Sequence, residues 1–294
     1  MNPKNQKRES HKTPSQVDSS DTDVLIEEHQ TTENSNQTHS SEPKPKKQEM
    51  KTFIFNLQEK GGTGKSFLTV LQAYKEQNNE RSLFADADAS TKSTIRNLKF
   101  LENRKPLRIA EISLLDARGK IVRDKLLSIM EQMVKDLDYD NYYLDFGAPE
   151  SQQFTELITK DLLPTDLKAF EEHLNVKFVF NIIVAGGTAF GSCTDYLKKL
   201  VDLLGDHFEV NIMANEAMFY NFEHLLDELN QFAKASGEKV NSVKRFGDFD
   251  ISNETGKNIL SNIEKGLGVE NLSFTAKLKM NNELAKIFHE RKIS

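Results

Sequence analysis

The clearest chemistry in the sequence lies in residues Lys60–Ser66, which read Lys-Gly-Gly-Thr-Gly-Lys-Ser. Glycines let a backbone curl so that successive N–H groups point at one anion. A lysine ammonium can neutralise β- and γ-phosphate charge, and a serine hydroxyl can bind Mg²⁺. The pattern therefore predicts a nucleotide-phosphate loop with Lys65 and Ser66 in these two roles. The remaining residues that we expect to line the nucleotide are Gly61, Gly62, Thr63 and Gly64.

The loop departs from the commonest phosphate-loop pattern, which begins with glycine at the position of Glu59. This sequence instead has a second lysine, Lys60, ahead of the glycine pair. Two ammonium groups in one loop would both act on phosphate charge. We assign Lys65 to catalysis, and Lys60 can neutralise the phosphates of its own subunit.

Polar side chains follow three further apolar runs. Asp86 and Asp88 come after one run, Asp145 after a second and Asn215 after a third. A carboxylate at the end of a buried strand is costly unless it is paired or near a metal, so Asp86 and Asp145 are predicted metal groups. The Asn215 amide offers a donor and an acceptor to a purine edge. Capping of a helix by Asp88, of a turn by Asp145 and turn formation by Asn215 stay open as alternatives.

These residues need a scaffold that gathers strand ends at one edge. Short apolar runs alternate with segments of helical periodicity, which is typical of an α/β fold with a mostly parallel sheet and helices on both faces. Ligands bind such sheets at the carboxyl ends of the strands. The predicted strands are 52–57, 82–85, 107–115, 142–144, 177–185 and 208–214, and the predicted helices cover 67–74, 122–137, 196–204 and 219–232.

Composition divides the 294 residues into two parts. Residues 1–50 contain no aromatic residue and no glycine, so we predict a disordered tail followed by one domain over 51–294. The net charge of −6 argues against a generally basic nucleic-acid binder. The single cysteine, Cys193, excludes an intrachain disulfide framework, and no stretch approaches about 20 apolar residues, so a cytoplasmic protein without a transmembrane segment is expected.

The two-lysine loop resembles that of the ParA/MinD family of deviant Walker A ATPases, which are P-loop NTPases with a three-layer α/β/α fold. The resemblance implies that ATP and Mg²⁺ are bound and that ATP binding promotes a homodimer. It also implies a catalytic role for Lys60, which would reach the partner's nucleotide. It also implies that Asp88 orients the attacking water. The family's Asp-x-Asp-Pro-Gln is altered here to Asp86-Ala-Asp88-Ala-Ser, which puts the hydrolysis rate in doubt.

A second resemblance concerns the turns Asp145-Phe-Gly-Ala and Gly186-Gly187. These are similar to turns in the plasmid conjugal-transfer and stability ATPases of TraL/StbB type. The resemblance implies a slow dimeric ATP switch in plasmid partition, conjugal transfer or positioning of a cellular complex, with a DNA-processing or partition protein as partner. A metabolic P-loop enzyme of dethiobiotin-synthetase or amidase type, and a pseudo-ATPase, remain alternatives.

Basic residues gather near the C-terminus beside the apolar residues Leu284, Ile287 and Phe288. A helix docked on the domain is favoured, and a nonspecific DNA patch or a weak membrane-surface helix are the alternatives. The basic residues are Lys277, Lys279, Lys286, Arg291 and Lys292.

Overall fold

The computed structural model describes residues 50–88, 93–118 and 120–288. The predicted tail, apart from Met50, lies outside these residues, as do Ala89, Ser90, Arg291 and Lys292. Within the described ranges, no helix has both the length and the apolar character needed to cross a membrane.

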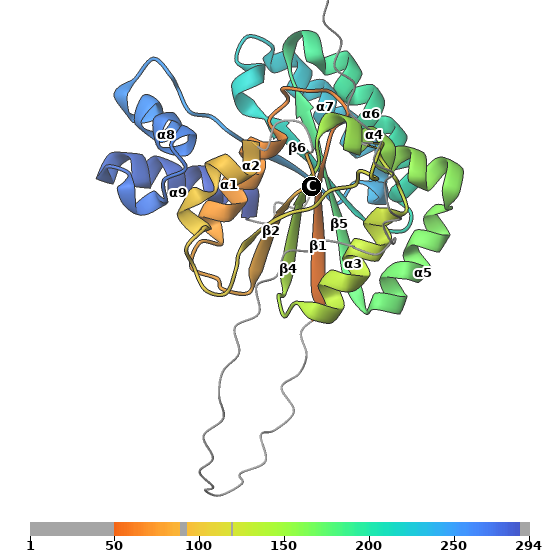
Figure 1. Cartoon of the computed structure of the whole chain (residues 1–294). Coiled ribbons are helices and arrows are strands. Elements are labelled where there is room, and N and C mark those ends of the chain that lie inside the picture. The colour runs from red at the N-terminus through yellow and green to blue at the C-terminus, as the bar shows by residue number, and fades with distance from the viewer. Residues whose placement is uncertain (1–49, 89–92, 119, 289–294) are drawn as a thin grey trace, which may run out of the picture. The chain divides into compact units, whose positions relative to one another are not determined.

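A parallel sheet forms the centre of the fold (Figure 1). Its seven strands lie in the order β3-β2-β4-β1-β5-β6-β7, and every neighbouring pair is parallel. This confirms the predicted α/β fold class. The strands are β1 (Lys51–Leu57), β2 (Ser82–Asp86), β3 (Ile109–Glu111), β4 (Asn141–Asp145), β5 (Val176–Ala185), β6 (Glu209–Asn215) and β7 (Ser242–Phe246).

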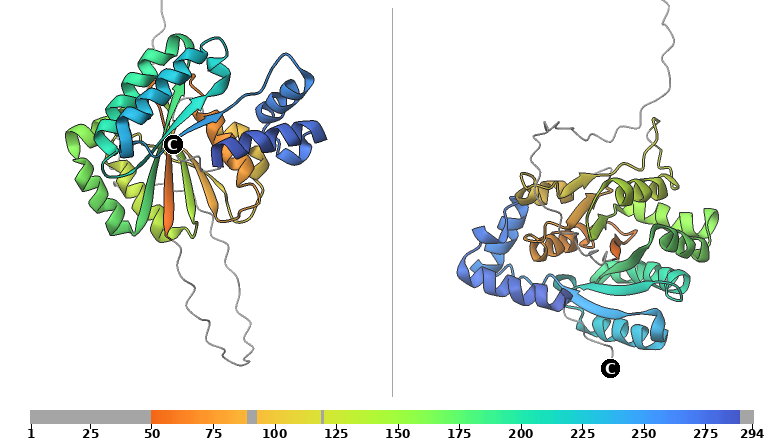
Figure 2. Two further views of the ribbon diagram at one scale, coloured as in Figure 1. Left: turned by 180° about the vertical axis from the view of Figure 1, so that it is seen from behind. Right: turned by 90° about the horizontal axis from the view of Figure 1, so that it is seen from below.

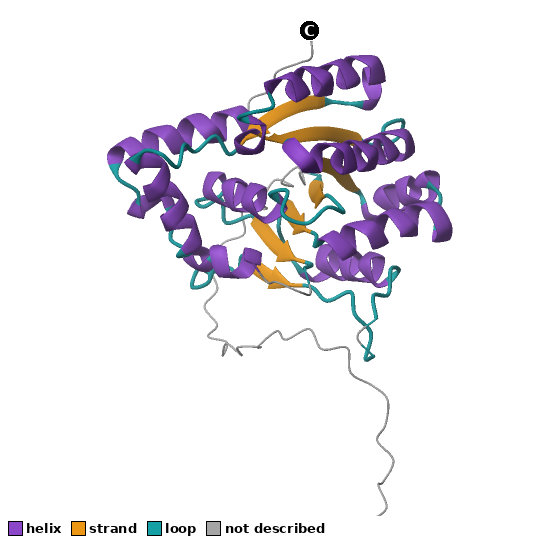
Figure 3. Cartoon of the chain, turned by 90° about the horizontal axis from the view of Figure 1, so that it is seen from above, coloured by secondary structure: helices purple, strands orange, loops and turns teal. Residues whose placement is uncertain are grey.

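Helices cover both faces of this sheet, so that the strands are apolar on both sides (Figures 1 and 3). One face, here the α1 face, packs against α1 (Lys65–Lys75), α2 (Ser93–Asn97), α8 (Glu254–Glu264) and α9 (Phe274–Phe288). The opposite face, here the α6 face, packs against α3 (Lys125–Asp136), α4 (Ala148–Glu156), α5 (Pro164–Leu174), α6 (Phe190–Leu204) and α7 (Glu223–Ser236). Seen from below, α8 and α9 lie across the sheet from α5 and α6 (Figure 2).

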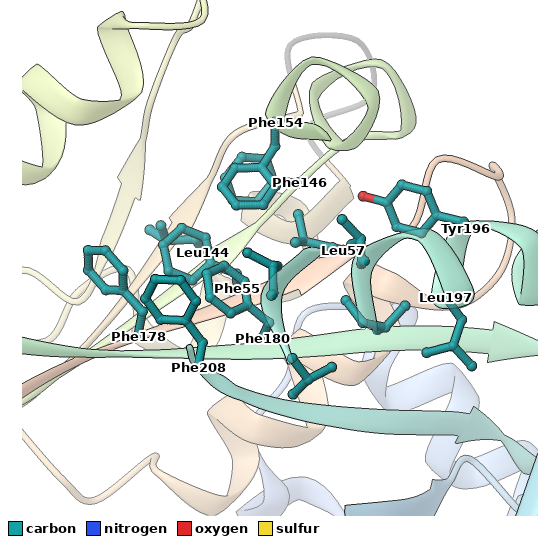
Figure 4. Packing of buried hydrophobic residues seen from close by; sticks show 14 of the residues in the cluster. Phe55, Leu57, Leu144, Phe146, Phe154, Phe178, Phe180, Tyr196, Leu197 and Phe208 are labelled. Carbon is teal, nitrogen blue, oxygen red and sulfur yellow. The ribbon is translucent and has the colours of Figure 1, made fainter. Parts of the chain in front are cut away.

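The α6 face is filled by aromatic rings (Figure 4). Phe55 of β1 stacks on Phe180 of β5 at 4.7 Å between ring centroids and meets Phe178 edge-on at 5.5 Å. Phe154 of α4 and Phe208 before β6 extend the same cluster. Such pairs add to the burial of large apolar areas, so this face is the main hydrophobic core.

The α1 face carries a line of polar residues across the sheet, which we call the polar row. Strand pairing aligns Glu111, Asp86, Asp145, Asn56, Asn181, Asn211 and Ser242 in one register, one residue from each strand. Register partners in a parallel sheet share a face. All but Glu111 are buried. The row therefore places the two predicted metal carboxylates side by side, with Asp145 next to β1, the strand that leads into the phosphate loop.

Two predicted boundaries are wrong for one reason. The predicted strand 107–115 is reduced to β3, because the chain leaves the sheet and Leu114 accepts a backbone hydrogen bond from Val122 at 2.7 Å. This contact uses the residues expected to begin the helix 122–137, so α3 starts only at Lys125. Elements without a predicted counterpart are β7, α4, α5 and α8.

Candidate phosphate-binding site

The glycine-rich loop lies between β1 and α1, at the carboxyl edge of the sheet. Gly62 and Gly64 adopt positive φ angles of 74° and 105°. A Cβ on Gly64 would also fall 2.5 Å from Nδ2 of Asn215. Gly64 is therefore required both by its backbone conformation and by the close approach of β6.

Two buried amide side chains hold this loop in place. Gln58 donates from Nε2 to the Ile183 carbonyl at 2.7 Å, and its Oε1 accepts from the Lys60 backbone N–H at 3.1 Å. Asn215 donates from Nδ2 to the Thr63 carbonyl at 2.9 Å. The amide predicted to contact a purine thus supports the loop, and purine contact stays a prediction. Gln58 was missed by sequence reasoning, since a single glutamine after a strand has no distinguishing pattern.

The two lysines of the loop differ in environment. Lys65 is buried, with 8% of its surface exposed, and its Nζ donates to the Lys60 carbonyl at 3.4 Å. Burial lowers the pKa of Lys65, while the charges of Asp145, Asp88 and Glu150 oppose this change. The Lys60 side chain is exposed. Lys65 is therefore confined to its own loop, and Lys60 is accessible to another molecule.

The carboxylate of Asp145 is fully buried near Lys65. Burial raises its pKa, and the hydroxyls of Thr94, Ser66 and Thr69 and the charge of Lys65 oppose the rise. Its Oδ2 accepts a hydrogen bond from the Thr94 hydroxyl. Its Oδ1 has no hydrogen-bond partner among the described residues. A buried carboxylate oxygen without a partner is costly and fits a site that takes a cation.

Asp86 neighbours Asp145 in the polar row. Burial, followed by the charge of Asp145, raises the pKa of Asp86 to about 7, against the opposing backbone N–H groups of Asp88 and Ile95. The two N–H groups donate to Asp86 at 3.0 and 3.3 Å respectively. Two adjacent buried carboxyls repel when both are charged, so a cation would relieve this repulsion.

The fit to Mg²⁺ rests on Ser66 together with Asp145. In the part of the chain that the structure describes, no group of three or more His, Cys, Asp or Glu side chains could hold a metal alone. Hydroxyl and carboxylate oxygens are suitable ligands for Mg²⁺, which usually takes its other oxygens from water and phosphate. The residues present therefore fit a magnesium ion that arrives with a nucleotide.

Two further carboxylates surround Gly147, which follows Asp145 after one residue. A Cβ on Gly147 would fall 2.1 Å from Oε2 of Glu150 and 3.1 Å from Cγ of Asp88. Asp88, predicted to be catalytic, therefore lies beside the turn that leaves β4. Glu150 was not predicted, although Pro149 before it signals the first turn of a helix, where an acidic residue is favoured.

Other residues of the chain fill the space beside the Gly186-Gly187 turn. A Cβ on Gly186 would lie 2.3 Å from the Met218 carbonyl oxygen, and one on Gly187 would lie 3.1 Å from the Phe222 ring. Gly187 also has a positive φ of 64°. These contacts explain the glycines as a tight turn between β5 and α6.

The C-terminal helix α9 docks on the domain, as the favoured interpretation predicted. Leu284 and Ile287 are buried in the core of the α1 face. Lys286 contacts Glu216 at 2.7 Å and Glu283 at 2.9 Å, and Lys279 contacts Asp248 at 3.2 Å. Lys279 and Lys286 are thus committed to carboxylates within the domain.

The solved structures similar to this chain include two MinD structures and a nucleotide-binding protein. The MinC:MinD cell division protein complex of Aquifex aeolicus matches at 14% identity and a TM-score of 0.47, covering 82% of this chain and 97% of that chain. The MinD cell division protein of Aquifex aeolicus matches at 14% identity and 0.43, with 82% and 98% covered. A nucleotide-binding protein from Archaeoglobus fulgidus in complex with ADP matches at 12% and 0.42, with 82% and 93% covered.

No protein-family profile matches the sequence, and no curated protein matches it in a sequence search.

Proposed function

We propose that this chain is a Mg²⁺-dependent ATPase of ParA/MinD type that binds ATP tightly and hydrolyses it slowly. The observation that carries the proposal is the conformation of Lys60–Ser66. Gly62 and Gly64 have positive φ angles, the Lys65 ammonium is buried beside a cluster of carboxylates, and the loop leads directly into α1. Backbone N–H groups ahead of a helix form a favourable site for phosphate.

In this proposal, Gly61–Gly64 donate backbone hydrogen bonds to the triphosphate, and Lys65 balances charge on its β- and γ-phosphates. Ser66 and Asp145 hold the metal, with Asp86 next to them. When bound, Mg²⁺ would neutralise charge on the phosphate oxygens and orient the triphosphate. Asn215 holds the loop through Thr63 and is proposed to contact the purine by its remaining amide capacity.

Hydrolysis is assigned to Asp88 and Lys60. Asp88 lies beside Gly147 near the buried Lys65, where a carboxylate can orient the attacking water. Lys60 is exposed, which suits an ammonium that reaches the nucleotide of a second copy in an ATP-dependent homodimer. Binding of ATP would then control dimerisation, and slow hydrolysis would reverse it.

We further propose that the domain over 51–294 acts in the cytoplasm as a switch in plasmid partition, conjugal transfer or positioning of a cellular complex. Its partner would be nonspecific DNA or a DNA-processing or partition protein. Because two lysines of α9 are committed to ion pairs within the domain, a partner protein is the better supported of these two.

The test is calorimetric titration of the full chain with ATP in the presence and absence of Mg²⁺. Wild type should bind, and Lys65→Ala should lose at least about 100-fold in affinity, because a buried ammonium on phosphate is removed. Lys234→Ala, which removes an exposed lysine of α7, is the control and should retain binding. Equal affinity of Lys65→Ala and wild type would refute the site.

Light scattering with and without ATP tests the dimeric switch separately. A dimer that forms only with ATP supports it, and Lys60→Ala should then hydrolyse ATP more slowly in the dimer. A monomer under both conditions would contradict the switch while leaving nucleotide binding intact.

A further inference from the structure

The first turn of α2 donates hydrogen bonds to all three residues predicted to hold the metal. Ser93 Oγ donates to Ser66 Oγ at 3.0 Å, and the Ile95 backbone N–H donates to Oδ2 of Asp86 at 3.3 Å. Between them, the Thr94 hydroxyl donates to Oδ2 of Asp145. Three consecutive residues of one short helix thus contact three residues from α1, β2 and β4.

Thr94 is the least replaceable of these donors. Its side chain is 1% exposed, so its hydroxyl has no access to bulk water and depends on Asp145 for a partner. Thr94 is the main hydroxyl that acts on Asp145, ahead of Ser66 and Thr69, and it donates to Oδ2, whereas Oδ1 has no hydrogen-bond partner in the described chain.

We propose that Thr94 is a positioning residue for the magnesium site, which fixes the carboxylate of Asp145 and reserves Oδ1 for the metal. This inference rests on the proposed function, because it concerns the same site. The hydrogen bond from the Thr94 hydroxyl fixes the orientation of the Asp145 carboxylate, and the oxygen without a partner, Oδ1, is the one left to a cation. Groups that orient metal-binding side chains in this way strengthen metal binding without touching the metal.

The contact between Thr94 and Asp145 depends on one functional group of the threonine. The hydroxyl is needed, and the methyl group only fills space against the α1 face. Thr94→Val keeps the shape and removes the donor, whereas Thr94→Ser keeps the donor and removes the methyl group. The two variants therefore separate positioning of Asp145 from packing.

The experiment measures how much Mg²⁺ each full-length variant needs to bind a fluorescent, slowly hydrolysed ATP analogue. For Thr94→Val, the half-saturating Mg²⁺ concentration should rise roughly tenfold, while binding of the analogue in EDTA stays unchanged. Thr94→Ser should remain within about twofold of wild type. Thr155→Val is the matched control, since Thr155 is also 1% exposed and its hydroxyl donates to Ser151 and Tyr196, neither of which is predicted to hold the metal.

Each outcome supports or overturns the role of Thr94. Wild-type binding that depends on Mg²⁺, combined with an unchanged requirement in Thr94→Val, overturns the role of Thr94 alone. An equal rise in Thr94→Ser and Thr94→Val also overturns it, because packing would then be responsible. Failure of wild type to bind the analogue with Mg²⁺ overturns both this role and the proposed function. Should Thr94→Val not fold, Thr94→Ala provides the same comparison with Thr94→Ser.

Discussion

The two faces of the sheet use the same strands for different purposes. Toward α6, β1 and β5 present Phe55, Phe178 and Phe180, which pack ring against ring. Toward α1, the neighbouring residues Asn56 and Asn181 are joined by a hydrogen bond of 3.0 Å. Alternation along a strand thus gives an aromatic core on one side, and on the other a row of hydrogen-bonded polar groups set within a second apolar cluster.

The two faces contribute differently to the stability of the fold and to the position of the phosphate loop. Asn56 donates to Thr69 at 2.8 Å and to Gln72 at 2.7 Å, both on α1. Buried amides add little net stability but require particular partners, so they fix the geometry of the elements that they join. The α6 face therefore supplies most of the free energy of folding, and the α1 face fixes the phosphate loop and its helix.

The largest expected effect is a loss of stability from the α6 face that leaves ATP binding unchanged. Phe180→Ala should lower the free energy of unfolding by about 3–5 kcal/mol, because a fully buried ring that contacts Phe55, Phe154 and Phe208 is lost. Urea denaturation measures this, with the exposed Tyr220→Ala as control, expected within about 0.5 kcal/mol of wild type. The ATP affinity of the folded variant should not change. A large loss of affinity would break the comparison.

The next largest effect concerns Asp88, whose removal should change the rate of ATP hydrolysis and not the affinity for ATP. Asp88→Ala should slow ATP hydrolysis roughly 100-fold, since the group that orients water is removed, while ATP affinity stays within about threefold. Single-turnover phosphate release and calorimetry measure the two quantities. Asp227→Ala, an exposed carboxylate on α7, serves as control. Unaltered hydrolysis in Asp88→Ala would remove Asp88 from the mechanism.

A smaller effect tests the polar row itself. Asn56→Ala should lower the free energy of unfolding by about 2 kcal/mol, because Thr69, Gln72 and Asn181 lose a buried partner. It should also weaken ATP binding several-fold through α1. The control is Asn211→Ala in the same row, which should cost similar stability but leave ATP affinity unchanged, since Asn211 bonds to β5 and β7. If both variants lower affinity equally, the row does not act through α1.

The smallest effect concerns pH. The pKa of Asp86 is about 7 in the folded chain and ordinarily 3.8, so the native state binds this proton more tightly than the unfolded chain does. Stability from this group is therefore greatest at low pH and is lost as pH rises from about 4 to about 7.

Asp86→Asn should accordingly raise the free energy of unfolding at pH 8 by about 1–2 kcal/mol without nucleotide, and by less at pH 5. Urea denaturation at the two pH values checks the difference. The order should reverse with Mg²⁺ and ATP, because the cation favours the charged carboxylate. An identical pH dependence in wild type and variant would contradict the raised pKa.

Local patterns were enough to predict part of this molecule. The α/β fold follows from strand and helix alternation. The places of Asp86, Asp145 and Asn215 at strand ends follow from polar residues after apolar runs, whereas the roles assigned to them and to Lys60–Ser66 stay predictions. Strand β7 was missed because Lys244 and Arg245 interrupt its apolar character. Its place in the sheet depends on pairing with β6, which no local pattern encodes.

The partners of the site were beyond sequence reasoning for a related reason. Thr94 is one threonine among many until folding sets it against Asp145, and Glu150 becomes relevant only because Gly147 brings it beside Asp88. The polar row likewise appears only when seven strands are aligned. Residue types and spacing thus indicate which groups act, and tertiary pairing determines which groups hold them in position.

The contacts of α9 have a consequence for how the protein is made. Lys286 joins Glu216, the neighbour of Asn215, and lies 3.7 Å from Asp248, the neighbour of Gly247. The loop after β6 and the loop after β7 are therefore joined by α9, which follows all seven strands of the sheet in the sequence. During translation, a ribosome-bound chain could pair its central strands early, yet it could not complete this side of the site until α9 had emerged.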